Sequence, residues 1–123
     1  MNAVFADSFD APAVAASNRL SAILVTTHWV LVEVADALGM PTTRTRVASF
    51  LKQVSSDPNI HVVPLERGLY ERGVDLYARR PDKLWSLTDC ISFVAMTERG
   101  LTDALTGDHH FEQAGFRALL RSR

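Results

Sequence analysis

Short apolar runs that alternate with longer amphipathic segments restrict this chain to few folds. Short continuous apolar runs are typical of strands buried on both faces, as in a parallel sheet. We expect strands at residues 4–6, 22–25, 60–63 and 101–106, with an edge strand at 116–120. Neighbouring parallel strands need long crossover connections, which are usually helices. The alternation therefore predicts a three-layer α/β/α domain with a central, mostly parallel sheet of four or five strands.

The segments between the runs carry helix signals. Thr27 and Ser86 are residue types that cap helix N-termini, and Pro12 suits a first helical turn. Gly39 and Pro81 stand where helices should end. We expect helices at residues 10–20, 28–38, 44–54, 66–80 and 87–100, and a loop at 55–59. These helices supply the crossovers that a parallel sheet requires.

The size of the chain suits one domain over residues 1–123. With 123 residues, 47% of them apolar, it can bury roughly two-thirds of the surface of the unfolded chain. The single cysteine, Cys90, excludes an internal disulfide and a zinc cluster built on cysteines. No apolar stretch is long enough to cross a membrane. We therefore expect a soluble protein of the cytoplasm, with no membrane partner.

Acidic residues gather at one predicted edge of the sheet. Asp7 directly follows the first strand, and Asp108 closely follows the fourth. Glu33 lies in the second turn after the second strand, among apolar neighbours, and Asp89 lies in the first turn of the helix that Ser86 caps. Ligands of open parallel sheets bind beyond the carboxyl ends of the strands. We therefore take these four acids as the candidate site, and expect Glu33 to be a buried carboxylate that needs a partner.

A cluster of carboxylates needs positive charge. Two carboxylates 4 Å apart repel by about 4 kcal/mol at an effective dielectric near 20, so they must bind a cation or raise their pKa values. Oxygen ligands without cysteine favour Mg²⁺ or Mn²⁺ over zinc. Residues 41–83 hold eight Lys or Arg against five acids, which suits a phosphate-bearing substrate. With a formal net charge of -1, an ordinary mixed surface explains the charges equally well. The acids themselves favour phosphodiester hydrolysis by a nuclease.

Four short motifs carry these acids in order along the chain. They are Phe5-Ala6-Asp7-Ser8, Thr26-Thr27-His28-Trp29 through Glu33-Val34, Ser86-Leu87-Thr88-Asp89-Cys90-Ile91-Ser92-Phe93 and Ala104-Leu105-Thr106-Gly107-Asp108-His109-His110-Phe111. Together they resemble the acidic motifs of the PIN-domain ribonucleases, and most of all those of VapC-type toxins from prokaryotic type II toxin-antitoxin pairs. The resemblance covers almost the whole chain.

This resemblance implies a metal-dependent endoribonuclease. Asp7, Glu33, Asp89 and Asp108 would hold one or two Mg²⁺ or Mn²⁺ ions beside an RNA substrate. The resemblance also implies inhibition by a small cognate antitoxin protein, and frequent homodimerisation.

One departure from the family pattern lies in the shortened segment at 8–21, between the first acid and the second strand. A helix there of about 14 Å still recrosses a four-residue strand, so we expect the fold to survive. We also expect a more open active-site mouth and weaker activity. The alternative is a catalytically weak or inactive PIN-like protein, or an RNA interaction module. A receiver-like phosphoacceptor is disfavoured, because no lysine follows a late strand near the acids.

Each acid also has a structural role open to it. Asp89 completes a capping-box pattern with Ser86. Asp7 and Asp108 have the positions of turn residues, and Glu33 could reach the surface or pair with an arginine. The ordered set of four favours the metal role over these separate explanations.

Neighbouring polar residues are assigned structural roles or left open. We expect His109 and His110 to be surface residues on a turn rather than ligands, and Cys90 to be a small buried side chain. Ser8 and Thr106 either cap turns or bond water at the site. The basic residues that could bind phosphate, or equally complement a helix C-terminus, are Arg79, Arg80 and Lys83.

Overall fold

A five-stranded parallel sheet forms the centre of the molecule. The computed structural model describes residues 3–121. Its strands are β1 (Ala3–Ala6), β2 (Ile23–Thr27), β3 (Ile60–Val63), β4 (Asp103–Leu105) and β5 (Arg117–Ala118). They lie in the order β3-β2-β1-β4-β5, and each neighbouring pair is parallel. The predicted parallel sheet is therefore confirmed, with β1 at its centre.

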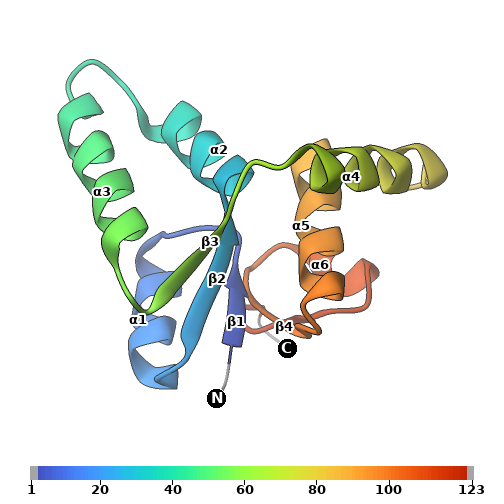
Figure 1. Ribbon diagram of the computed structural model, residues 1–123. Coiled ribbons are helices and arrows are strands. Elements are labelled where there is room, and N and C mark those ends of the chain that lie inside the picture. Colours follow the sequence, from blue (N-terminus) through green and yellow to red (C-terminus); the bar gives the residue numbers. More distant parts are fainter. Residues whose placement is uncertain (1–2, 122–123) are drawn as a thin grey trace.

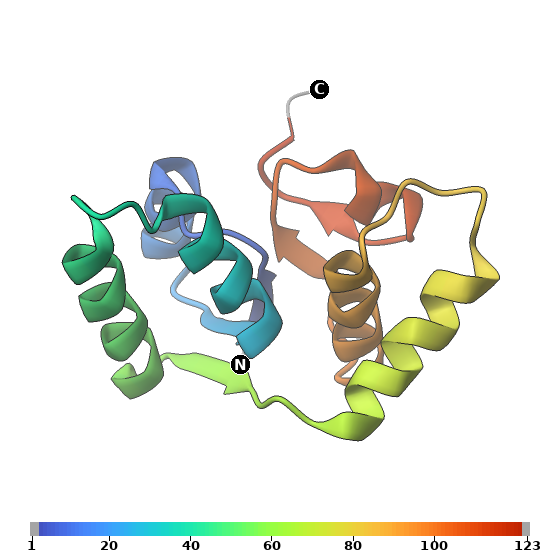
Figure 2. The same cartoon turned by 90° about the horizontal axis from the view of Figure 1, so that it is seen from above.

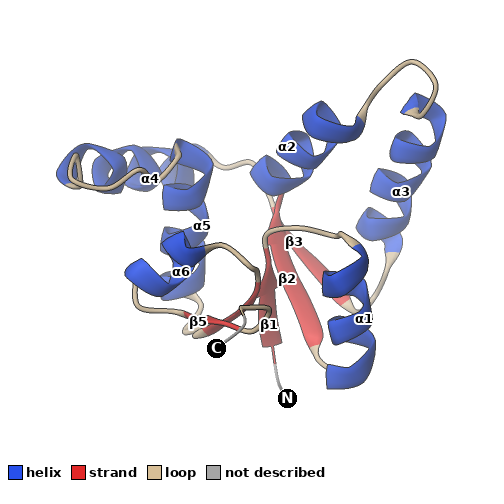
Figure 3. Ribbon diagram, turned by 180° about the vertical axis from the view of Figure 1, so that it is seen from behind, coloured by secondary structure: helices blue, strands red, loops and turns tan. Residues whose placement is uncertain are grey.

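Helices cover both faces of this sheet. They are α1 (Ala11–Leu20), α2 (His28–Leu38), α3 (Arg44–Ser56), α4 (Arg67–Arg79), α5 (Leu87–Glu98) and α6 (His109–Gln113). Helices α1 and α3 lie on one side of the sheet, and α4, α5 and α6 lie on the other (Figure 1). Helix α2 continues from the end of β2 at the carboxyl edge, as the view from behind also shows (Figure 3). The predicted three-layer α/β/α architecture is confirmed.

Side chains of the strands contribute to two apolar cores, one on each face of the sheet. Phe5 and Val25 belong to the larger core, which α5 fills from its side of the sheet. Val4 and Leu24 belong to a smaller core that includes Ala16 of α1. Successive strand residues point to opposite faces, so both faces of the short runs are buried. This two-sided burial is the reason that the runs are continuously apolar.

Two local expectations were wrong. The predicted loop at 55–59 begins later, because Ser55 and Ser56 continue α3 and donate their hydroxyl hydrogens to the carbonyls of Leu51 and Gln53. Serine can satisfy its hydroxyl on the preceding helical turn in this way. The other difference is α6, a helix of five residues where a turn was expected. No helix within residues 3–121 has the length and apolar character that crossing a membrane requires.

Helices α4 and α5 pack unusually closely. Seen from above (Figure 2), they lie side by side. The contact point is Gly73 of α4, where an added Cβ would overlap Cγ1 of Ile91. Ile91 is completely buried and lies in α5 two positions after Asp89, near the start of the helix at Leu87. This packing holds the N-terminal turn of α5, and with it Asp89, against the rest of the domain.

Candidate metal centre

Asp7 is the first residue after β1 and has two unequal oxygens. Its Oδ2 accepts a hydrogen bond of 2.8 Å from the hydroxyl of Thr106. Its Oδ1 is buried and has no hydrogen-bond partner among the described residues. The pKa of Asp7 is raised to about 6, mainly by burial and also by the nearby charges of Asp108 and Asp89, while the Thr106 hydrogen bond opposes the rise. An unpartnered buried carboxylate oxygen calls for a cation or a proton.

Two buried threonines fix the position of Asp7. Thr26 on β2 donates its hydroxyl hydrogen to the carbonyl of Ala6 at 2.8 Å, and so holds the end of β1. Thr106, which follows β4, bonds Asp7 directly. Both threonines are almost completely buried. The three central strands therefore determine together where the Asp7 carboxylate lies.

Thr106 also connects Asp7 with Asp108. The Thr106 hydroxyl oxygen accepts a hydrogen bond of 3.0 Å from the backbone N–H of Asp108. Asp108 then caps α6, because its Oδ1 accepts a hydrogen bond of 2.9 Å from the backbone N–H of His110. A cap of this kind explains why the chain turns into a helix directly after β4.

Asp89 lies at the start of α5 in a complete capping box. Its Oδ2 accepts from the backbone N–H of Ser86 at 3.1 Å, while the Ser86 hydroxyl oxygen accepts from the backbone N–H of Asp89 at 3.0 Å. The capping box, which the sequence left open as the alternative role of Asp89, is thus present. The same Oδ2 also faces Nδ1 of His110 at 3.1 Å. Asp89 is therefore a cap that also belongs to the acidic cluster.

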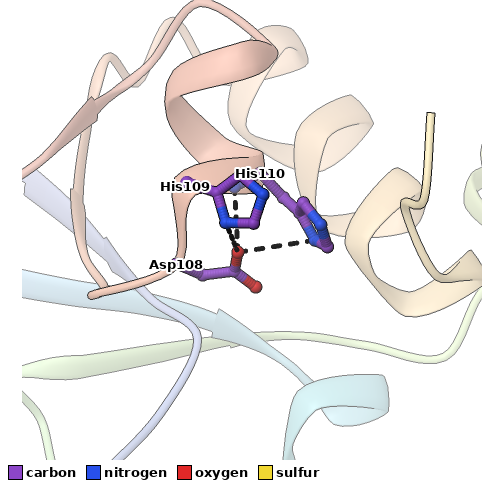
Figure 4. Close-up of side chains that lie close together, drawn as sticks. All are labelled: Asp108, His109 and His110. Atoms are coloured by element: carbon purple, nitrogen blue, oxygen red, sulfur yellow. Dashed lines mark hydrogen bonds and ion pairs between the residues drawn. The ribbon is translucent and has the colours of Figure 1, made fainter.

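His110 lies between two of the acids, unlike the surface residue that we expected. Its Nδ1 is 3.1 Å from Oδ2 of Asp89 and 3.4 Å from Oδ1 of Asp108, and its side chain is 18% exposed. His109 is 56% exposed, as expected. Figure 4 shows both rings beside Asp108. The sequence signal that could have indicated this arrangement is the aromatic Phe111 directly after His110. In the structure Phe111 is fully buried and packs the short α6 against the core.

The three aspartates share one pattern. Each has one oxygen held by the protein, and among residues 3–121 no hydrogen bond reaches the other oxygen. The free oxygens are Oδ1 of Asp7, Oδ1 of Asp89 and Oδ2 of Asp108. Hard oxygen donors of this kind are the ligands that Mg²⁺ and Mn²⁺ prefer. The donor set therefore fits a divalent cation, which would offset both the burial of the Asp7 carboxylate and its repulsion by Asp108 and Asp89.

The tightest group of potential ligand atoms is a different trio. Within the described part of the chain, only Asp108, His109 and His110 present ligand atoms that all lie within 4.8 Å of one another. The three aspartates are spaced more widely than this. Magnesium usually keeps several of its waters and binds only one or two carboxylates directly. Wider spacing is consistent with such an ion.

Glu33 differs from the other three acids. It is exposed on α2, and within residues 3–121 no hydrogen bond or ion pair joins it to the aspartates. The expectation that Glu33 is buried was wrong. Helix α2 buries Val30 and Leu31, but Val32 is 52% exposed, so the apolar residues around Glu33 do not enclose it. Its membership of the site stays a prediction.

The other residues singled out from the sequence have structural contacts. Arg80 forms a two-bond ion pair with Asp82, and its guanidinium lies 5.2 Å from the centre of the Trp85 ring. Lys83 lies 4.0 Å from the same Asp82 carboxylate. Arg80 and Lys83 thus have an acidic partner in Asp82. Cys90 is fully buried, as predicted, and burial raises the pKa of its thiol.

The fold and the site together define a three-layer α/β/α domain with an acidic centre at the carboxyl edge of a parallel sheet. This fold is also that of VapC20 from Mycobacterium tuberculosis, a sarcin-ricin loop cleaving toxin whose crystal structure superposes with a TM-score of 0.77. The two sequences are 24% identical, and the match covers 94% of this chain and 96% of that one. The fold that the VapC resemblance implied is thereby confirmed. No family model and no curated protein sequence matches the chain.

Proposed function

We propose that this chain is a metal-dependent endoribonuclease that hydrolyses RNA phosphodiester bonds, and that it is the toxin of a toxin-antitoxin pair in the cytoplasm. One observation carries the proposal. Within the described residues, Asp7, Asp89 and Asp108 at the carboxyl edge of the sheet each have one carboxylate oxygen that no hydrogen bond reaches. The likeness of the fold to VapC20, which cleaves the sarcin-ricin loop, supports RNA as the substrate.

The residues have separate tasks in this proposal. Asp7, Asp89 and Asp108 would hold Mg²⁺ or Mn²⁺, joined by Glu33 as the family resemblance implies. When bound, such an ion activates water and stabilises negative charge on the phosphate. Thr106 holds Asp7 in place through its hydroxyl, and the capping box holds Asp89. No covalent enzyme intermediate is needed, which agrees with the burial of Cys90.

We also propose a small antitoxin protein as a partner, and a homodimer in solution. An apolar groove between α2 and α3 offers a surface that a protein partner could cover. Its lining includes Phe9, Val34, Leu38, Val47 and Phe50. Co-expression with the product of a neighbouring small open reading frame should give a stable complex that lacks RNA cleavage. Cleavage that is unchanged in such a complex would contradict the antitoxin assignment.

RNA cleavage in defined metal buffers tests the enzymatic proposal. Wild-type protein should cleave RNA with Mg²⁺ or Mn²⁺ and stop cleaving in EDTA, and Asp89→Asn should be inactive in both. Asp75→Asn is the matched control, because Asp75 is an exposed aspartate on α4, outside the cluster. The proposal would be overturned if Asp89→Asn in EDTA cleaved RNA as fast as wild type does with Mg²⁺ or Mn²⁺. RNA binding without cleavage would favour the interaction module instead.

A further inference from the structure

The His110 ring joins two acids that come from different elements. Asp89 belongs to the first turn of α5, and Asp108 lies between β4 and α6. Nδ1 of His110 faces Oδ2 of Asp89 at 3.1 Å and Oδ1 of Asp108 at 3.4 Å. The helix caps hold each carboxylate to its own helix, through Ser86 for Asp89 and through the backbone of His110 for Asp108. Among the described residues, only the ring contacts both carboxylates directly.

The chemistry of the contact assigns a role to the ring nitrogen. An ionised carboxylate has only acceptor oxygens, so a ring nitrogen between two of them must carry a hydrogen to bond either one. That hydrogen bonds Oδ2 of Asp89 at 3.1 Å, and Oδ1 of Asp108 lies 3.4 Å from the same nitrogen. Both are the oxygens that the caps already hold. No hydrogen bond from residues 3–121 reaches the opposite oxygens, Oδ1 of Asp89 and Oδ2 of Asp108. Nδ1 is thereby occupied and is not itself available to an ion.

We propose that His110 is a positioning residue of the metal centre, which holds Asp89 and Asp108 at a fixed separation so that their free oxygens can bind one divalent ion. This inference rests on the proposed function. Residues that hydrogen-bond metal-ligating carboxylates typically change metal affinity about 10- to 100-fold when they are replaced. The ring should therefore act on the affinity for the metal rather than on the chemical step.

Two substitutions separate the ring's role from that of its backbone. His110→Ala removes the Nδ1 donor but keeps the backbone N–H that caps Asp108. His110→Asn places an amide N–H near the position of Nδ1, so it can still donate to both carboxylates. His61→Ala is the matched control, because His61 is an exposed histidine on β3.

Titration calorimetry with Mn²⁺ alone measures the effect without RNA. His110→Ala should weaken Mn²⁺ binding about 10- to 100-fold, while His110→Asn and His61→Ala should stay within about threefold of wild type. RNA cleavage by His110→Ala should need correspondingly more Mn²⁺ and approach the wild-type rate at saturation. Unchanged Mn²⁺ affinity in His110→Ala would overturn the proposal. So would an equal loss in His110→Asn, which would indicate that the ring ligates the ion directly.

The outcome for the wider proposal is read from Asp89→Asn in the same titration. If wild type binds Mn²⁺ and Asp89→Asn does not, the metal centre stands, and His110→Ala alone decides the role of the ring. If wild type and Asp89→Asn bind Mn²⁺ equally, the metal centre itself fails, and the inference about His110 fails with it.

Discussion

At the residue scale, the raised pKa of Asp7 makes the stability of the fold depend on pH. Burial raises the pKa of Asp7 from 3.8 to about 6, so between these values the folded state binds more protons than the unfolded state. Stability should therefore fall as the pH rises through this window, by about 3 kcal/mol in total. Asp7→Asn, which stays neutral, should match wild type near pH 3.5 and exceed it at pH 7. Denaturant unfolding in EDTA measures the difference.

The sign of this effect is its test. In metal-free buffer, the stability of wild type relative to Asp7→Asn should decline between pH 4 and pH 7. A rise over the same range would show that Asp7 is stabilised in its charged form, contrary to the unpartnered Oδ1. Comparison with Asp75→Asn removes any general effect of lost negative charge.

Asp89 has two roles that can be measured separately. Ser86→Ala and Asp89→Ala each remove one half of the capping box, which costs about 0.5–2 kcal/mol in EDTA. Relief of repulsion by the other acids should offset part of the cost for Asp89→Ala. A hundredfold excess of Mn²⁺ over its dissociation constant should stabilise wild type by about 2.7 kcal/mol. Ser86→Ala should keep most of that gain and Asp89→Ala should lose most of it. Thermal midpoints in EDTA and Mn²⁺ report both roles, and equal Mn²⁺ shifts in the two variants would leave Asp89 as a helix cap only.

The candidate site could be predicted from the sequence only in part. The aspartates are visible because each follows a strand or starts a helix, which are positions that local patterns reveal. Thr106 and His110 are not, because their roles depend on contacts made by folding. Thr106 bonds Asp7 across 99 positions of the chain, and His110 meets Asp89 across 21. Glu33 shows the opposite failure, since its apolar neighbours suggested a burial that the packing of α2 does not provide.

At the scale of elements, the close approach of α4 and α5 predicts that even one added methyl group at their contact lowers the stability of the protein. Gly73→Ala adds a methyl group that overlaps Ile91, so we expect a loss of about 1–3 kcal/mol despite the higher helix propensity of alanine. Gly68→Ala in the same helix is the control, because its new methyl group would meet only the flexible ends of Arg72 and Glu66. Thermal unfolding compares them. Equal stability of the two variants would mean that α4 can shift away from α5 without penalty.

The elements themselves were largely predictable because most are long or strongly apolar. The sequences of helices α1 to α5 contain capping residues or repeated apolar positions, and helices form where these signals predict them. Helix α6 has neither the length nor the repeats to reveal a period, and it exists because Asp108 caps it and Phe111 is buried. Thr26 and Thr27 extend β2 beyond its apolar run, since their hydroxyls bond Ala6 and cap α2. Polarity alone does not distinguish a buried threonine at the end of a strand from a threonine in a turn.

At the scale of the whole molecule, the short connection between β1 and β2 shapes the region beside the site. Residues 8–10 enter the ten-residue α1 and border the apolar groove, where Phe9 packs edge-on against Phe50 at 5.4 Å between ring centres. We expect this short segment to leave the site open, with weak RNA affinity and low turnover. Replacing residues 8–21 with a longer segment from a relative should strengthen RNA binding. Unchanged RNA binding and activity after the graft would show that the length of segment 8–21 does not limit RNA affinity or turnover.

The most direct test of the central claim is the rate of RNA cleavage as a function of Mn²⁺ concentration for wild type, Asp7→Asn, Asp89→Asn, Asp108→Asn and Glu33→Gln, with Asp75→Asn as control. The substrate is an RNA that contains a sarcin-ricin loop, compared with an unrelated hairpin. Wild type and Asp75→Asn should show the same Mn²⁺-dependent rate, and each aspartate variant should be slower by about two orders of magnitude or more. Glu33→Gln decides whether the exposed fourth acid joins the site. Cleavage that needs no metal and persists in Asp7→Asn, Asp89→Asn and Asp108→Asn would contradict the account.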